Sequence, residues 1–236
     1  TDPGREEPLY AAATDCLLHL QSHPPPADLP NLSAANWAEA ACFAPDWYAL
    51  AATGRTPDRA ALLEAMTRAL VAWADGPRVL ILRDYHAENL LWLPGREGLA
   101  RVGLLDFQLG QLGQPGYDLV SLLQDARRDV APETEAAMMA RFASATGAAP
   151  DRFAAHYAVL GAQRALRILG VFARLSVKAG KPGYLRLLPR VWGQLQRNLM
   201  HPVLADLRRV CNAMLPPPTP DILQRIESQC PTSPSR

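Results

Sequence analysis

Two short apolar runs separated by a turn constrain this chain more than any other feature, because a polar residue stands at the outer end of each run. The first run covers residues 90–93, turn-forming residues occupy 94–98, and the second run covers residues 100–105. The pattern predicts two strands paired as an antiparallel hairpin. In such a pair the start of the first strand lies beside the end of the second. We therefore expect Asn89 and Asp106 to lie side by side.

A third polar residue precedes this hairpin. The segment Arg83-Asp84-Tyr85-His86-Ala87-Glu88-Asn89 follows an apolar run of strand length at residues 79–82. Phosphoryl transfer needs a carboxylate aimed at the attacking hydroxyl and oxygen ligands for magnesium, and an Asp-x-x-x-x-Asn loop followed by a second Asp supplies both. The pattern predicts Asp84 as the catalytic base, with Asn89 and Asp106 as Mg²⁺ ligands. Asp and Asn are also common in turns, where their side chains cap the backbone.

Other polar residues near this pattern have both functional and structural interpretations. His86 either contacts substrate or supports the loop by hydrogen bonding, and the supporting role is favoured. Asp118 opens a predicted helix, where a carboxylate is favourable, and is expected to support the catalytic loop. Phe107 is expected to pack under that loop. Residues that could face a sugar or phosphate, or equally lie on a solvated face, are Glu88, Gln108, Arg127, Arg128, Gln163 and Arg164.

Composition excludes several classes of protein. Of the 236 residues 49% are hydrophobic and 20% charged, which is typical of a soluble globular protein. The net charge of +1 and the lack of a long basic run argue against nucleic acid as a partner. No apolar segment approaches the roughly 18 residues of a membrane span. The four cysteines are widely spaced, which favours free thiols in a cytoplasmic protein over a zinc site or disulfides.

Apart from the three short apolar runs the chain has mostly helical periodicity, so the expected class is α+β. We expect residues 1–77 to form a helical linker and the first helices, 78–215 the catalytic and substrate-binding core, and 216–236 a Pro-rich polar tail. A helix cap is expected at Thr56, with Pro57 as the first helical residue. The expected helices cover residues 9–20, 34–52, 57–75, 117–126, 133–145, 151–177, 182–199, 202–214 and 222–226.

The segments 83–93, 102–108 and 117–123 resemble the aminoglycoside phosphotransferase/choline kinase-like family, and within it the bacterial anomeric amino-sugar kinases. The resemblance implies the C-terminal lobe of a protein-kinase-like fold, mostly helical, with a small β-hairpin that carries the catalytic loop. It also implies Mg²⁺, ATP or GTP as the phosphoryl donor, and a small-molecule sugar as the acceptor. By this resemblance the acceptor would be N-acetylmuramate or N-acetylglucosamine, phosphorylated at the anomeric hydroxyl during recycling of cell-wall sugars in the cytoplasm.

The sequence departs from that family at three points. Leu82 replaces a His that many relatives place two residues before the base, and Leu109 stands where another acid is expected. The β-rich N-terminal lobe, with its phosphate-covering loop and strand Lys, is absent, since Lys178 and Lys181 both follow the catalytic loop. We expect that lobe in the full-length protein. Two alternatives stay open: an aminoglycoside or choline-like amino alcohol as acceptor, and an inactive sugar-binding lobe without a nucleotide clamp.

Overall fold

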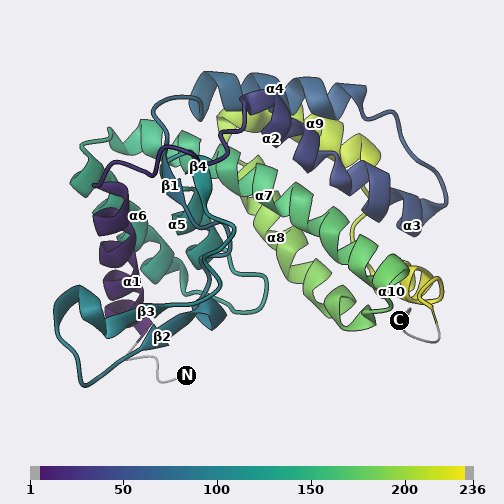
Figure 1. The fold of residues 1–236 in the computed structure, drawn as a ribbon. Helices are drawn as coiled ribbons and strands as arrows, with labels where there is room; N and C mark the ends of the chain where they lie inside the picture. Colours follow the sequence, from purple (N-terminus) through teal and green to yellow (C-terminus); the bar gives the residue numbers. More distant parts are fainter. Residues whose placement is uncertain (1–5, 232–236) are drawn as a thin grey trace. The chain divides into compact units, whose positions relative to one another are not determined.

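The computed structural model describes residues 6–231, and they form two compact units (Figure 1). The first unit comprises the chain up to Leu32 together with residues 75–157, and the second comprises residues 33–74 and the chain from Ala158 onward. The expected division into residues 1–77, 78–215 and 216–236 stays a prediction. Residues 1–5 and 232–236 lie outside the described part. No helix among the described residues has the length and apolar character needed to cross a membrane.

The first unit combines helices with four three-residue strands. Its helices include α1 (Glu6–Gln21), α5 (Tyr117–Leu123), α6 (Pro132–Thr146) and the first turns of α7 (Pro150–Ala179). Two 3₁₀ turns, η3 (Ala87–Asn89) and η4 (Gly98–Arg101), precede strands of the hairpin. The strands are β1 (Val79–Ile81), β2 (Leu90–Trp92), β3 (Val102–Leu104) and β4 (Gln111–Gly113).

The hairpin predicted from the sequence is confirmed. Strands β2 and β3 pair antiparallel, with Leu90 opposite Leu104 and Trp92 opposite Val102. A second antiparallel pair, β1 with β4, was not predicted on the β4 side. Its register places Gly113 opposite Val79, and a Cβ atom at Gly113 would overlap the Ile81 side chain, so only glycine fits there.

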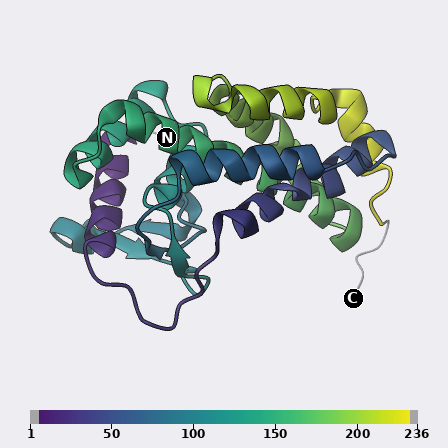
Figure 2. The same ribbon diagram turned by 90° about the horizontal axis from the view of Figure 1, so that it is seen from above.

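Helix α1 anchors the first unit. Its apolar stripe, which includes the fully buried Leu17, faces the interior, and α1 lies beside α6 (Figure 2). Arg141 of α6 donates two hydrogen bonds, of 2.6 and 2.7 Å, to the carboxylate of Asp15 on α1. The tyrosine hydroxyl of Tyr85 donates to the Ala13 carbonyl at 2.7 Å, which ties the segment after β1 to the same helix.

The second unit is helical. It contains α2 (Ala34–Ala41), the π-helix η2 (Ala44–Ala49), α3 (Leu50–Thr53), α4 (Ala60–Trp73), most of α7, η5 (Pro182–Leu187), α8 (Leu188–Leu199), η6 (Pro202–Leu204), α9 (Ala205–Met214) and α10 (Pro220–Glu227). Helices α2 and α4 pack side by side (Figure 2). The single helix expected over residues 34–52 is interrupted, because Pro45 lacks an N–H and stands in the first turn of η2. The expected cap at Thr56 is wrong, since α4 begins at Ala60, whose N–H is bound by the Asp58 side chain at 2.9 Å.

Within the second unit α7 packs tightly against its neighbours. Leu160, Leu166 and Leu169 are fully buried, as expected for the predicted central helix. At Gly170 the backbone of α7 comes so close to the Phe43 carbonyl that a Cβ atom would overlap it. Glycine is therefore required at this crossing.

Candidate active site

The segment after β1 is fixed by one buried carboxylate. Asp118, in the first turn of α5, is fully buried, and it accepts hydrogen bonds from the backbone N–H of Leu82 at 2.5 Å and of Arg83 at 2.9 Å. Both donors lie just past the end of β1, where the ladder with β4 no longer supplies partners. Asp118 therefore sets the direction in which the chain leaves the strand.

The backbone at Arg83 has an unusual conformation. Its φ of 71° lies in the left-handed region, which costs free energy for a residue with a side chain. The Asp118 bond to its N–H and a 3.3 Å bond from the Ser121 hydroxyl to its carbonyl oxygen stabilise this conformation. This left-handed conformation turns the chain abruptly, so that Asp84 begins an irregular loop instead of continuing the strand.

The two ends of the Asp-x-x-x-x-Asn loop are joined directly. The side-chain amide Nδ2 of Asn89 donates to the Asp84 carbonyl oxygen at 2.9 Å, and the Asn89 backbone N–H donates to the His86 carbonyl at 2.9 Å. Since Nδ2 points at a carbonyl acceptor, the orientation of the amide is defined by its hydrogen bonds. The Oδ1 atom of Asn89 is left as an acceptor that no described residue uses.

Asp106 is brought to Asn89 by the hairpin. Beyond the last strand pair, the Leu105 N–H donates to the Asn89 carbonyl oxygen at 2.9 Å, so Asp106 follows immediately after a residue bonded to Asn89. The Asp106 side chain is exposed, and its Oδ1 accepts a 2.6 Å hydrogen bond from Gln108. A side-chain hydrogen bond thus connects the segments of Asp84 and Asn89, and a backbone hydrogen bond connects the segments of Asn89 and Asp106, as the strand pattern predicted for the last two.

The expectation for Phe107 is wrong, because its side chain is 60% exposed and does not pack under the loop. Asp106 has a left-handed backbone with φ of 56°, and a tight turn follows, in which the Gly110 N–H donates to the Phe107 carbonyl at 3.1 Å. That turn directs residues 105–109 outward. Leu105 and Leu109 are exposed as well, at 46% and 48%.

The few oxygen atoms that this site offers are compatible with Mg²⁺, the ion that the sequence suggests. Among the described residues no group of three or more His, Cys, Asp or Glu side chains could enclose a metal ion. Asn89 Oδ1 and the Asp106 carboxylate offer two hard oxygen ligands. Mg²⁺ commonly takes one or two carboxylates and completes its shell with phosphate oxygens and water.

His86 and Tyr85 are the buried residues of the loop. His86 is 8% exposed, and its Nε2 lies 3.4 Å from Asn89 Nδ2. Tyr85 is 2% exposed, and burial raises the pKa of its hydroxyl well above the usual range, so that it stays a neutral donor to Ala13. The sequence reasoning missed Tyr85, although an aromatic residue between two polar loop residues is a signal of packing.

Of the six candidate substrate contacts, Arg128 is exposed and the other five fall into two groups. In the first unit Arg127 Nε forms a 3.1 Å ion pair with Glu88, and Gln108 binds Asp106, so three of these residues contact site residues or each other. In the second unit Gln163 is fully buried and donates to the Trp37 carbonyl at 2.8 Å, and Arg164 is 6% exposed. Their contacts with a substrate stay predictions.

Comparisons with known proteins agree on a family. A profile of the Phosphotransferase enzyme family matches residues 2–156. A protein of Caulobacter vibrioides named N-acetylmuramate/N-acetylglucosamine kinase is 52% identical over 128 residues, which are 53% of this chain and 35% of that protein. Proteins of the same name from Pseudomonas putida and Pseudomonas aeruginosa are 30% and 29% identical, over 84% and 87% of this chain and 60% and 62% of their own lengths. The chain thus spans about a third to three fifths of the relatives that it matches.

Proposed function

Because the chain belongs to the Phosphotransferase enzyme family, we propose that it forms the acceptor- and metal-binding part of a kinase. In this proposal the γ-phosphoryl group of a nucleotide is transferred to a hydroxyl of a small molecule. The observation that supports it most is the hydrogen-bonded connection of the Asp84, Asn89 and Asp106 segments. A general base and two metal ligands are the groups that this reaction requires from such a lobe.

The proposed acceptor is an N-acetylated amino sugar, attacked through its anomeric hydroxyl. Its support is the name N-acetylmuramate/N-acetylglucosamine kinase, which the matched relatives share. Glu88, Gln108, Arg127, Gln163 and Arg164 are the proposed contacts to this sugar or to the phosphate. An aminoglycoside or a choline-like amino alcohol is the second candidate acceptor, and an inactive sugar-binding lobe is the third possibility.

The mechanism assigns one role to each side chain of the loop. The Asp84 carboxylate takes the proton of the acceptor hydroxyl as its oxygen attacks the γ-phosphorus and the bond to the nucleoside diphosphate breaks. Asn89 and Asp106 would hold Mg²⁺, which neutralises phosphate charge when it is bound. Asp118 keeps the loop in register through Leu82 and Arg83, and His86 supports Asn89. A displacement of Asp84 would therefore lower the rate of phosphoryl transfer itself.

The nucleotide clamp is proposed to lie outside these residues. The sequence contains no Gly-rich loop followed by a strand Lys, and the matched relatives are longer than this chain. ATP or GTP would bind between that further segment and the candidate metal ligands, in a cytoplasmic protein. The 236 residues alone should then transfer phosphate poorly or not at all.

An acceptor panel tests the proposal. The full-length protein is incubated with Mg²⁺, with ATP or GTP, and with N-acetylmuramate, N-acetylglucosamine, kanamycin or choline, and the product is identified by ³¹P NMR. We expect a sugar 1-phosphate. Asp84→Asn should lower turnover by about 10³-fold, because the general base is lost, while sugar binding persists. The matched control Asp151→Asn, an exposed carboxylate in the first turn of α7, should leave turnover unchanged.

The outcomes separate the candidates. Phosphate on kanamycin or choline, and not on the sugars, would select the second acceptor class. Sugar binding without transfer by the full-length protein would select the inactive lobe. Full activity of Asp84→Asn would show that the base is misassigned.

A further inference from the structure

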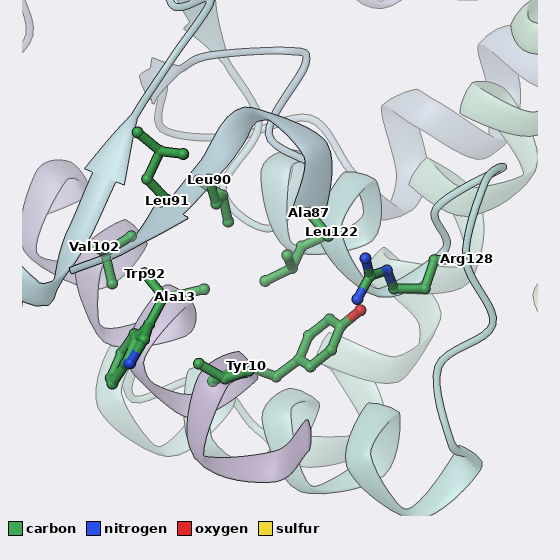
Figure 3. Close-up of a pocket in the computed structure, with 10 residues that line it drawn as sticks. Tyr10, Ala13, Ala87, Leu90, Leu91, Trp92, Val102, Leu122 and Arg128 are labelled. Atoms are coloured by element: carbon green, nitrogen blue, oxygen red, sulfur yellow. The ribbon is translucent and has the colours of Figure 1, made fainter. Parts of the chain in front are cut away.

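A cavity of about 240 Å³ lies in the first unit beneath the β2–β3 hairpin (Figure 3). Its walls come from α1, the hairpin with its preceding turn, α5, and the segment that follows α5. Most of the lining is apolar and includes Leu9, Ala13, Leu90, Trp92, Val102 and Leu122. Asp84, Asn89 and Asp106 are not among its lining residues, so the cavity is separate from the candidate metal ligands.

One buried polar group faces this cavity without a partner. Tyr10 of α1 is 6% exposed, and its hydroxyl makes no hydrogen bond with any described residue. Burial raises the pKa of this hydroxyl to about 12, against the opposing effect of the Arg128 charge, so it is a neutral donor near pH 7. Buried hydroxyl groups in folded proteins are almost always hydrogen-bonded. The Tyr10 hydroxyl is therefore available to a polar group that enters the cavity.

A cation stands beside that hydroxyl. The guanidinium group of Arg128 lies next to the Tyr10 hydroxyl at the edge of the cavity (Figure 3). Its neighbour Arg127 is paired with Glu88, but no hydrogen bond or ion pair joins Arg128 to another described residue. The carboxylates of Asp125 and Glu6 also act on Tyr10, each more weakly than Arg128 does.

The chemistry of the occupant follows from these groups. Both polar groups of the cavity can donate hydrogen bonds, and Arg128 carries a positive charge, so they favour an occupant with an acceptor, preferably an anionic one. The planar guanidinium fork matches a carboxylate in two-point geometry. The apolar walls, with the flat rings of Trp92 and Tyr10, require an apolar body, and the small volume limits it to about one or two rings.

We propose that this cavity is a second binding site, distinct from the phosphoryl-transfer site, for a small amphipathic carboxylate. The carboxylate accepts hydrogen bonds from the Tyr10 hydroxyl and the Arg128 guanidinium, and the apolar body fills the space between α1 and the hairpin. Ala87, in the turn between Asp84 and Asn89, also lines the cavity. A bound molecule therefore contacts the loop that carries Asp84 and Asn89.

Binding of matched acids and amides tests the site independently of any transfer activity. Titration calorimetry on the full-length protein compares benzoate and 2-naphthoate with benzamide and 2-naphthamide, which have the same body without the charge. We expect each acid to bind at least tenfold more tightly than its amide. Hydrogen exchange should show protection by the acid in residues 6–21 and 84–93, where the lining residues lie.

Three variants assign the effect to the named groups. Arg128→Gln should lower the affinity for the acids at least tenfold, to that of the amides, and Tyr10→Phe should lower it about threefold. Arg152→Gln, an exposed arginine on α7 in the same unit, is the matched control and should bind normally. Because the Arg128 side chain is exposed, its variant should keep the circular dichroism spectrum of the parent.

Several results would overturn the proposal. Equal affinity for acid and amide would remove the role of the cation, and unchanged binding by Arg128→Gln would do the same. Protection confined to other segments would place the ligand elsewhere. Failure of both acids to bind the full-length protein would show that the cavity is not a site for aromatic carboxylates.

Discussion

The two units of this protein fix their backbones by different means. In the first unit, irregular segments between three-residue strands are fixed by hydrogen bonds between side chains and the backbone, as at Asp118, Asn89 and Tyr85. In the second unit, helices pack through apolar side chains and a close backbone approach at Gly170. A few directional bonds define the geometry of a loop, whereas helix packing distributes its energy over many contacts. The proposed base and metal ligands lie in the first unit, where side-chain hydrogen bonds fix the backbone.

The largest effect is expected where one carboxylate serves two backbone donors. Asp118→Ala should lower the free energy of unfolding by about 3 kcal/mol, because the N–H groups of Leu82 and Arg83 lose their buried acceptor. Urea denaturation followed by circular dichroism measures this loss. Asp118→Asn, which keeps one acceptor oxygen, should lose about half as much. A loss below about 1 kcal/mol in Asp118→Ala would show that packing alone fixes the loop and would remove the contrast between the units.

A smaller effect is expected at the helix crossing of the second unit. Gly170→Ala should cost about 2 kcal/mol, since the added methyl group overlaps the Phe43 carbonyl and forces α7 away from it. Gly193→Ala on α8 is the matched control: no atom lies within 4 Å of a Cβ there, so alanine should be neutral or stabilising. Turnover per folded molecule should stay unchanged in both. Reduced turnover in Gly170→Ala without lost stability would show that this crossing positions the chemical groups.

The smallest effect concerns alkaline pH and a buried thiol of the second unit. Burial raises the pKa of Cys211 from the usual 9.0 to about 12, so the thiol stays protonated in the folded protein while the unfolded chain releases its proton near pH 9. The stability that this burial contributes is complete below pH 9 and is lost as the pH rises toward 12. Between pH 8 and pH 10 the loss should be about 1 kcal/mol.

Urea denaturation at the two pH values measures this dependence. Cys211→Ala should show a pH-dependent loss that is smaller by that amount, whereas Cys230→Ala, at a half-buried position, should keep most of it. Equal pH dependence in Cys211→Ala and the parent would show that other groups cause the alkaline loss.

The hairpin could be predicted because its information is local: two apolar runs, turn residues between them, and polar residues at both ends. Strand β4 could not, since Gln111-Leu112-Gly113 shows no alternation and its pairing depends on the fit of Gly113 against Ile81. Phe107 was misplaced because a local pattern does not reveal where a left-handed residue such as Asp106 sends the chain.

For the candidate site the sequence suggests residue types, whose chemical roles stay predictions, and it says less about the hydrogen bonds that connect them. Acidic and amide residues at these spacings indicate a base and metal ligands, and an acid in a first helical turn indicates a capping or supporting role. The partners of Asp118 depend on the positive φ of Arg83, which is rare for arginine and leaves no mark in the sequence. Tyr85 was missed for a related reason, because its partner is a main-chain carbonyl 72 positions away.

The hydrogen bond of Asn89 explains why an amide, and not an acid, occupies that position. Aspartate would be the stronger ligand for a cation, yet both of its oxygens repel the carbonyl of Asp84, which now receives an N–H at 2.9 Å. The position requires a side chain that has a hydrogen-bond donor on one side and an acceptor lone pair on the other. Asparagine meets that requirement at this length: its Nδ2 closes the loop on the Asp84 carbonyl, and its Oδ1 stays available for the proposed metal ion.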